Sequence, residues 1–168
     1  MSTGTFESSR RSVVEAGSRP AALGGIEGFA ARHRDALLLL ARVLLGGIFV
    51  HSGLGKLMAL DGFAASLAKA GLPLSSVLAV IGACVEFGGG LAIVFGLVTR
   101  YAAILMVLFV IAATLISHRF WELQDAARRA QEINFSKNIA IIGGFVLVFA
   151  SGAGRFALDR LLPRSENA

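Results

Sequence analysis

The stretch ALLLLARVLLGGIFVHSGLG, residues 36–55, is long and apolar enough to cross a lipid bilayer as one helix. About 20 mostly apolar residues, at roughly 1.5 Å each, span the ~30 Å of hydrocarbon in a membrane. Hydrophobic residues make up 55% of the 168-residue chain and charged ones only 16%, which is too little charge for a soluble domain. Three further stretches meet the same requirement, namely residues 74–97, 101–117 and 138–154. The sequence therefore predicts an all-α fold, an integral membrane four-helix bundle.

The N-terminal residues 1–34 differ in composition from the rest, being rich in Ser, Gly, Arg and Glu. They contain no apolar core of the kind that marks a cleavable signal peptide. Gly24, Gly25 and Gly28 disfavour a helix there. We therefore expect a flexible, disordered cytoplasmic tail over 1–34, the four-span domain over 35–160 and a C-terminal tail over 161–168.

The connection between the first two spans has its own pattern. Phe63, Leu67 and Ala70 are spaced i, i+4, i+7, which predicts a short amphipathic helix in the membrane interface. The connection between the second and third spans is only residues 98–100, so those two helices must be antiparallel neighbours.

The distribution of Lys and Arg predicts the orientation. An even number of spans puts both termini on one side, and that side carries nine Lys and Arg residues against six on the other. Basic residues in short flanks resist translocation, so we expect both termini in the cytoplasm. The formal net charge of +5 requires no nucleic acid as a partner, because the lipid bilayer supplies anionic headgroups beside the basic tails.

Two ionisable residues of opposite charge lie deep within the spans. Arg42 is about 10 Å from the cytoplasmic edge and Glu86, on the antiparallel second span, about 16 Å. Either charge alone would cost several kcal/mol at such a depth, so pairing, a water-filled cavity or a protonated Glu is required. Among these, a buried Arg42–Glu86 ion pair is expected. One interpretation is a pair that fixes the helix register. The other is a proton-responsive or ligand-binding carboxylate.

Glycines in the spans lie near these charges. Small residues allow membrane helices to approach closely, so helix packing is the expected role and room for a ligand the alternative. The packing candidates are Gly46, Gly53, Gly88, Gly89, Gly143 and Gly144.

A second polar set lies at the opposite ends of the spans. A flat, amphipathic ring compound could dock against an aromatic side chain there and accept hydrogen bonds from the polar ones, so a quinone is a candidate cofactor. An ordinary aromatic belt with a snorkelling Lys is the alternative. The candidate headgroup residues are His51, Lys56, His118, Trp121 and Asn138.

Several chemistries are disfavoured by the sequence. Cys84 is the single cysteine, so the chain has no C-x-x-C pair, no thiolate metal cluster and no haem attachment motif. We expect Cys84 to be a buried small hydrophobe. No metal site and no catalytic residue is assigned.

Short motifs occur in a fixed order along residues 37–160 and together resemble those of the DoxX family of small four-helix membrane proteins. They are Arg42-x3-Gly46-x2-Phe49-x3-Gly53-x2-Lys56-Leu57, Glu86-x-Gly88-Gly89, Gly96-x2-Thr99-Arg100, His118-x-Phe120-Trp121, Lys137-Asn138 and Gly152-x-Gly154-x3-Leu158-Asp159. The family pattern often has Ser where this chain has Ala157.

The resemblance implies a location in the bacterial inner membrane and partnership with membrane-associated, quinone-linked oxidoreductases. By the same resemblance, the residues to single out are Arg42, Lys56, Glu86, Arg100, His118, Trp121 and Asn138. Three function classes follow as expectations. The first is an accessory or anchoring subunit of an oxidoreductase system, more a non-catalytic subunit than an enzyme. The alternatives are a small-molecule or proton-linked transport protein, and a structural membrane protein without a ligand.

Overall fold

The computed structural model describes residues 21–161, which form two compact units divided between Arg34 and Asp35. The first unit contains helix α2 (Ala21–Arg32), where the sequence had suggested a flexible tail. Alanines at both ends of α2 favour the helix and offset the three glycines between them. The prediction for residues 1–20, and that for 162–168, lie outside the described residues.

The second unit contains four helical segments long and apolar enough to cross a membrane. They are α3 (Arg34–Met58), α5 (Ser75–Phe95), α6 (Thr99–Ser117) with the short helix η1 (Phe120–Glu122), and α7 (Asp125–Ser151). No strand occurs in residues 21–161. The predicted all-α, four-span fold is therefore confirmed.

The helix between the first two spans is also confirmed, as α4 (Leu60–Lys69), with Leu67 buried. The fourth span was predicted to start at Asn138, but the helix that contains it starts earlier. Helix α7 begins at Asp125 and not at Asn138, because more than half of residues 125–137 are Ala, Arg, Gln, Glu or Lys, which favour helix. Hydropathy locates only the apolar part of such a helix.

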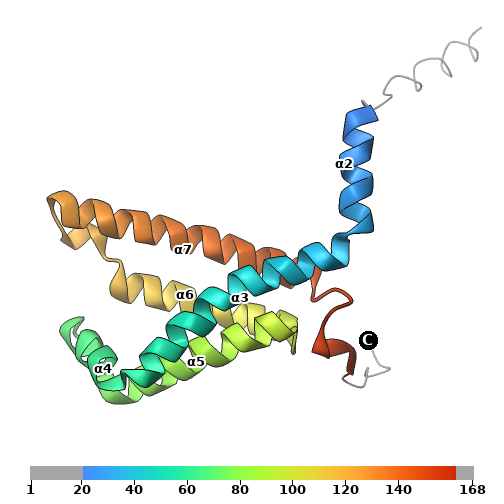
Figure 1. Cartoon of the computed structure of the whole chain (residues 1–168). Coiled ribbons are helices and arrows are strands. Elements are labelled where there is room, and N and C mark those ends of the chain that lie inside the picture. The colour runs from blue at the N-terminus through green and yellow to red at the C-terminus, as the bar shows by residue number, and fades with distance from the viewer. Residues whose placement is uncertain (1–20, 162–168) are drawn as a thin grey trace, which may run out of the picture. The chain divides into compact units, whose positions relative to one another are not determined.

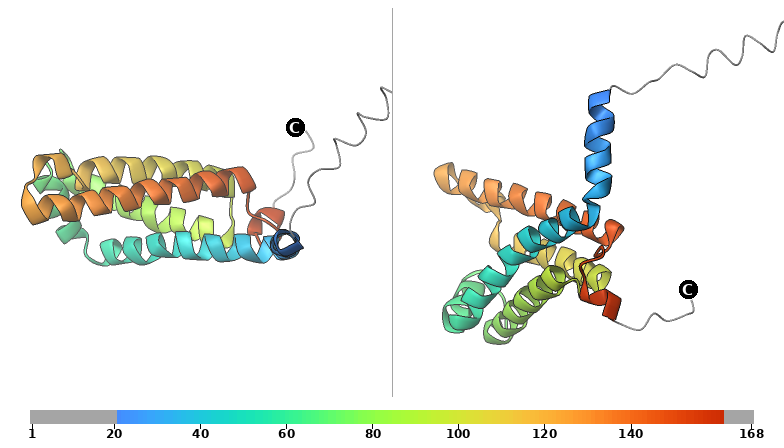
Figure 2. Two further views of the ribbon diagram at one scale, coloured as in Figure 1. Left: turned by 90° about the horizontal axis from the view of Figure 1, so that it is seen from above. Right: turned by 45° about the vertical axis from the view of Figure 1, so that its right-hand side comes forward.

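The four long helices converge at one end and separate toward the other (Figures 1 and 2). The closed end contains the turn between α5 and α6, where Gly96 ends α5 with a positive φ of 67°. At the open end, α6 and α7 lie apart from α3, α4 and α5.

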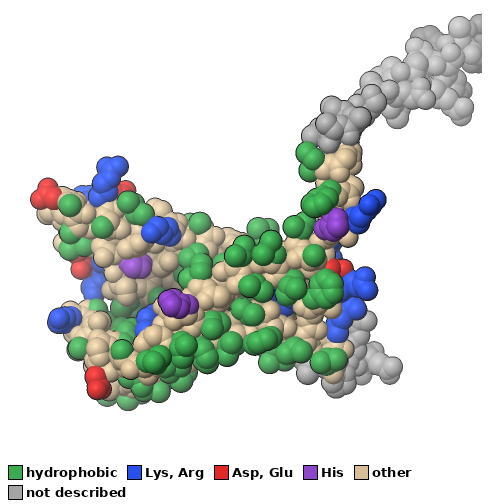
Figure 3. Space-filling model, viewed as in Figure 1, with side chains coloured by type: hydrophobic (Ala, Val, Ile, Leu, Met, Phe, Trp, Pro, Cys, Tyr) green, Lys and Arg blue, Asp and Glu red, His purple; other side chains and the backbone are tan. Residues whose placement is uncertain are grey.

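The core joins all four long helices. Phe49 of α3 and Phe145 of α7 pack with ring centroids 5.4 Å apart, against Ile93 of α5 and Met106 of α6. The outward faces carry apolar side chains, with Leu44 64%, Leu108 60% and Leu147 70% exposed. Figure 3 shows such side chains over α3 and α5, with charged ones gathered at the two ends. This pattern is that of a membrane protein, because contiguous apolar faces of this size are rare on soluble monomers.

Candidate functional site

Glycines bring α3 and α5 into close contact. The sequence predicted this role for six glycines, and the structure shows it at some of them. A Cβ added at Gly46 would lie 2.8 Å from the carbonyl oxygen of Gly90, and one at Gly53 would lie 2.6 Å from the backbone nitrogen of Phe87. Gly89 packs against the side chain of Met106. At Gly46 and Gly53 the added Cβ would meet backbone atoms of α5, so only glycine allows α3 and α5 to approach as they do.

Three other packing predictions have mixed outcomes. Gly144 lies against Leu45, which a Cβ would meet at 3.3 Å. Gly88 and Gly143 face open space, with no atom within 4 Å of an added Cβ. Helix packing does not require glycine at those two positions, because they point away from the neighbouring helices.

Arg42 and Glu86 are both buried, at 1% and 3% exposure, but their predicted mutual ion pair was wrong. Glu86 binds Lys56 instead, with Nζ of Lys56 2.5 Å from Oε2 of Glu86. The register explains this result. Glu86 lies at the level of Gly53 of α3. Gly53 is 11 residues, or about 16 Å, beyond Arg42 along that helix, so the Arg42 side chain cannot reach Glu86.

Arg42 lies at the closed end of the bundle. Its guanidinium donates to the carbonyl oxygens of Ile93, at 3.4 Å, and of Phe156, in the segment that follows α7. Asp159 in the same segment is close enough to interact electrostatically with Arg42, and its Oδ2 accepts a hydrogen bond from the backbone N–H of Thr99 at 3.0 Å. The C-terminal segment thus completes the closed end and binds the buried charge.

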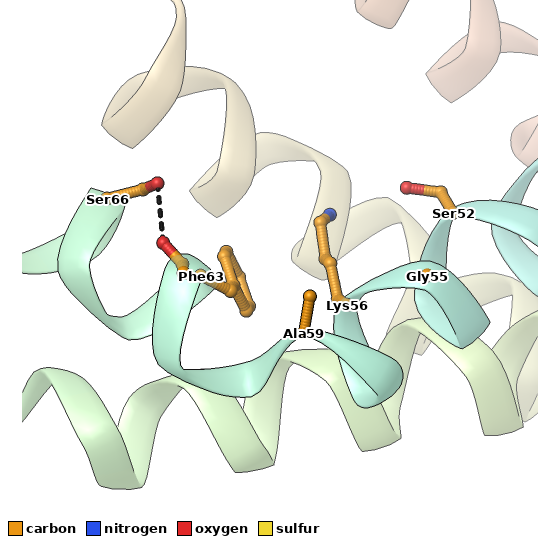
Figure 4. A pocket seen from close by; sticks show the side chains of 7 residues that line it. Ser52, Gly55, Lys56, Ala59, Phe63 and Ser66 are labelled. Carbon is orange, nitrogen blue, oxygen red and sulfur yellow. Dashed lines mark hydrogen bonds between the residues drawn. The ribbon is translucent and has the colours of Figure 1, made fainter.

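Two cavities share the side chains of Lys56 and Phe63 at the open end. The first, here the outer hollow, has a volume of about 330 Å³ and lies between the end of α3 and α4. Figure 4 shows Lys56 and Phe63 flanking Ala59 in its wall. The residues that line the outer hollow are Ser52, Gly55, Lys56, Ala59, Gly62, Phe63 and Ser66.

The second cavity, here the inner chamber, is about 200 Å³ and lies between α4, α5 and α6, next to the end of α3. Its walls are largely apolar. Leu67 comes from α4, Ile81 from α5 and Phe109 from α6, and Lys56 is the one charged side chain in the lining. The ammonium of Lys56 also lies 5.0 Å from the centre of the Phe63 ring, within cation–π range. Lys56 is therefore the polar group that both cavities share.

The other predicted headgroup residues do not surround a common site. The side chain of His51 is exposed on α3. Nδ1 of His118 lies 2.7 Å from Oε1 of Gln131, and Nδ2 of Asn138 donates to Oγ1 of Thr114 at 2.8 Å, so each joins α6 or its end to α7. These hydrogen bonds give His118 and Asn138 a structural role, since each connects two helical segments.

Trp121 is half exposed and packs edge-on against Phe120 and Phe135. Sequence reasoning missed Arg119, whose Nη2 donates to the carbonyl oxygen of Ala70 at 2.8 Å and so links the end of α6 to the loop after α4. The sequence signal for Arg119 was a basic residue directly after an apolar span. Its partner Ala70 could not be predicted, because it is distant in sequence.

Cys84 is exposed on α5, so the expectation of a buried thiol was wrong. Arg100, singled out by resemblance, is exposed near Gly152. Across residues 21–161, no three His, Cys, Asp or Glu side chains gather in a way that could hold a metal ion.

Comparison with known proteins identifies the family. The sequence profile of the DoxX family matches residues 37–119. The chain is 35% identical over 127 residues to inner membrane protein YphA of Escherichia coli, covering 76% of this chain and 91% of that relative. The chain belongs to the DoxX family.

Two further relatives are similar to this chain. Inner membrane protein YqjF of Escherichia coli is 34% identical over 128 residues, covering 76% of this chain and 93% of YqjF. The Bacillus subtilis protein named "Putative oxidoreductase CatD" is 39% identical over 75 residues, covering 45% of this chain and 54% of CatD. No solved structure matches the chain. The DoxX relationship and the four spans make this a membrane protein, and the two Escherichia coli relatives are named inner membrane proteins.

Proposed function

We propose that this protein is an accessory or anchoring subunit of a membrane-associated, quinone-linked oxidoreductase system, with the quinone ring bound beside Lys56. The observation that carries the proposal is the inner chamber, an apolar cavity inside a membrane protein with one ammonium group in its wall. A cavity of about 150 Å³ accepts benzene, so 200 Å³ suits a substituted ring.

Lys56 supplies the polar contact that a quinone needs. An ammonium has three N–H donors, and one of them serves Glu86. A second can donate to a quinone carbonyl oxygen, while Leu67, Ile81 and Phe109 contact the ring. Because Glu86 balances the charge of Lys56, the site as a whole suits an uncharged headgroup.

Electron transfer is assigned to a partner protein. The sequence has one cysteine and therefore no dithiol that could carry two electrons within the chain. The name of CatD, which proposes an oxidoreductase, supports a redox context for this chain.

The proposal includes an orientation. Asp35 and Arg155 meet at the closed end, where Oδ1 of Asp35 accepts a hydrogen bond from the backbone N–H of Arg155 at 2.9 Å. The greater number of basic residues on that side favours a cytoplasmic location for the closed end. The Lys56 site then opens toward the opposite leaflet.

Copurification tests the proposal. The protein is extracted in a mild detergent, and quinones, lipids and proteins that remain bound are quantified by mass spectrometry. We expect about one quinone per chain and an oxidoreductase partner in the wild type, with the quinone lost in Lys56→Met. Lys69→Met, an exposed lysine of α4, is the matched control and should retain it. A folded wild type that carries only phospholipid would contradict the proposal and favour a structural role.

A further inference from the structure

We propose that the inner chamber selects uncharged ring amphiphiles over anionic ones and that Glu86 is the residue that sets this preference. The inference concerns the site of the proposed function and rests on a ring binding there. It does not require that the ring be a quinone.

The two members of the ion pair differ in accessibility. The side chain of Glu86 is 4% exposed and that of Lys56 32% exposed. A ligand in either cavity therefore meets the ammonium, while the carboxylate lies behind it at hydrogen-bond distance. Glu86 acts on the ligand through Lys56 and is a positioning residue.

No other charge lines the site. Among the residues that form the walls of the outer hollow and the inner chamber, Lys56 alone is ionisable. The electrostatic character of the site is thus set by Lys56 and Glu86 together, and their sum is neutral.

This neutrality disfavours an anionic ligand. An anion drawn to Lys56 is repelled by the Glu86 carboxylate just beyond it, so the attraction and the repulsion largely cancel. The cost of removing the anion from water and placing it in an apolar chamber remains. An uncharged phenol or ketone avoids that cost and still accepts a hydrogen bond from Lys56, while its ring contacts Leu67 and Phe109.

Replacing Glu86 by Gln should change the preference. The amide oxygen of Gln can still accept the hydrogen bond from Lys56, so the ammonium stays in place. Its charge is then unbalanced, and an anionic ring becomes a suitable partner.

The test uses two probes of matched shape, 4-butylphenol and 4-butylbenzoate. Each is radiolabelled and titrated at pH 7 against the protein in nanodiscs, with empty nanodiscs as the blank for partition into lipid. We expect the wild type to bind the phenol at least tenfold more tightly than the benzoate. In Glu86→Gln the affinity for benzoate should rise about tenfold or more, while that for the phenol changes less than threefold.

Glu122→Gln is the matched control, because Glu122 is an acidic residue that pairs with Arg119, is 52% exposed and lines neither cavity. It should keep the wild-type preference. The inference is overturned if the wild type binds neither probe, binds both equally or prefers benzoate, or if Glu86→Gln behaves like the control. Should Glu86→Gln fail to fold, the wild-type preference alone still decides the ligand class.

The two proposals fail in different ways. Binding of butylphenol without any bound quinone in the copurification experiment would overturn the proposed function and leave this inference standing. Quinone in the purified protein together with equal affinities for the two probes would overturn only this inference.

Discussion

Substitution of Gly53 by Ala should separate α3 from α5 and destabilise the protein. The added Cβ would lie 2.6 Å from the backbone nitrogen and 2.8 Å from the Cα of Phe87. Both are backbone atoms of a helix, so no side-chain rotation can relieve the overlap. Since ordinary contact begins at 3.4 Å, the helices must move apart by roughly 0.8 Å at this point.

The expected cost follows from the packing of the pair. Forcing one extra methyl group into a well-packed contact costs about 1–3 kcal/mol, which for a chain of 168 residues corresponds to a melting temperature lower by roughly 2–10 °C. Lys56 lies one turn further along α3, so the same movement should lengthen its ion pair with Glu86 and weaken binding of butylphenol. Binding and stability should therefore fall together.

Thermal unfolding in detergent, followed by size-exclusion chromatography, measures the effect. Gly55→Ala is the matched control, because it lies two residues away on the same helix and its Cβ would meet nothing within 4 Å. The control should be neutral or slightly stabilising, since Ala favours helix more than Gly. Equal melting temperatures for the two variants would refute the close α3–α5 contact.

Three further predictions concern the buried charges and the turn between α5 and α6. In a double-mutant cycle of thermal stability, Lys56→Met and Glu86→Gln should show a coupling energy of about 1–3 kcal/mol. In a second cycle, Arg42→Leu and Glu86→Gln should be additive within about 0.5 kcal/mol. Strong coupling in the second cycle would indicate a direct Arg42–Glu86 pair. Val98 has a positive φ of 43°, which is strained for a β-branched residue, so Val98→Gly should raise stability in thermal melts by up to about 1 kcal/mol. Gly96→Ala, in the same turn, should lower it, because its Cβ would overlap Arg42; a stabilised Gly96→Ala would contradict the described turn.

The fold was largely predictable because hydrophobic length is a local property. The apolar stretch from residue 36 to residue 55 lies within α3, and the spacing of Phe63 and Leu67 predicted α4. Helix boundaries were less accurate where polar residues favour helix, as in the first half of α7, because the bilayer requirement sets the apolar length and not the helix length.

Of the five predicted headgroup residues, Lys56 alone lines the two cavities, and the arrangement around it was not predicted. Lys56 and Glu86 were both singled out, yet they were placed in different groups. Their pairing depends on the register of α3 against α5, which is set by Gly46 and Gly53 meeting the backbone of α5. A shift of one helical turn would have changed every partner.

The sequence by itself determined that the chain is a four-span, all-α membrane protein with buried charges, because apolar length and the cost of a charge in hydrocarbon act on each segment separately. The tertiary structure alone decided which charges meet. Glu86 binds Lys56 at the open end, and Arg42 binds the C-terminal segment at the closed end. The physical reason is that side chains reach only a few ångströms, so partners are chosen by close helix packing, which depends on residues far apart in the chain.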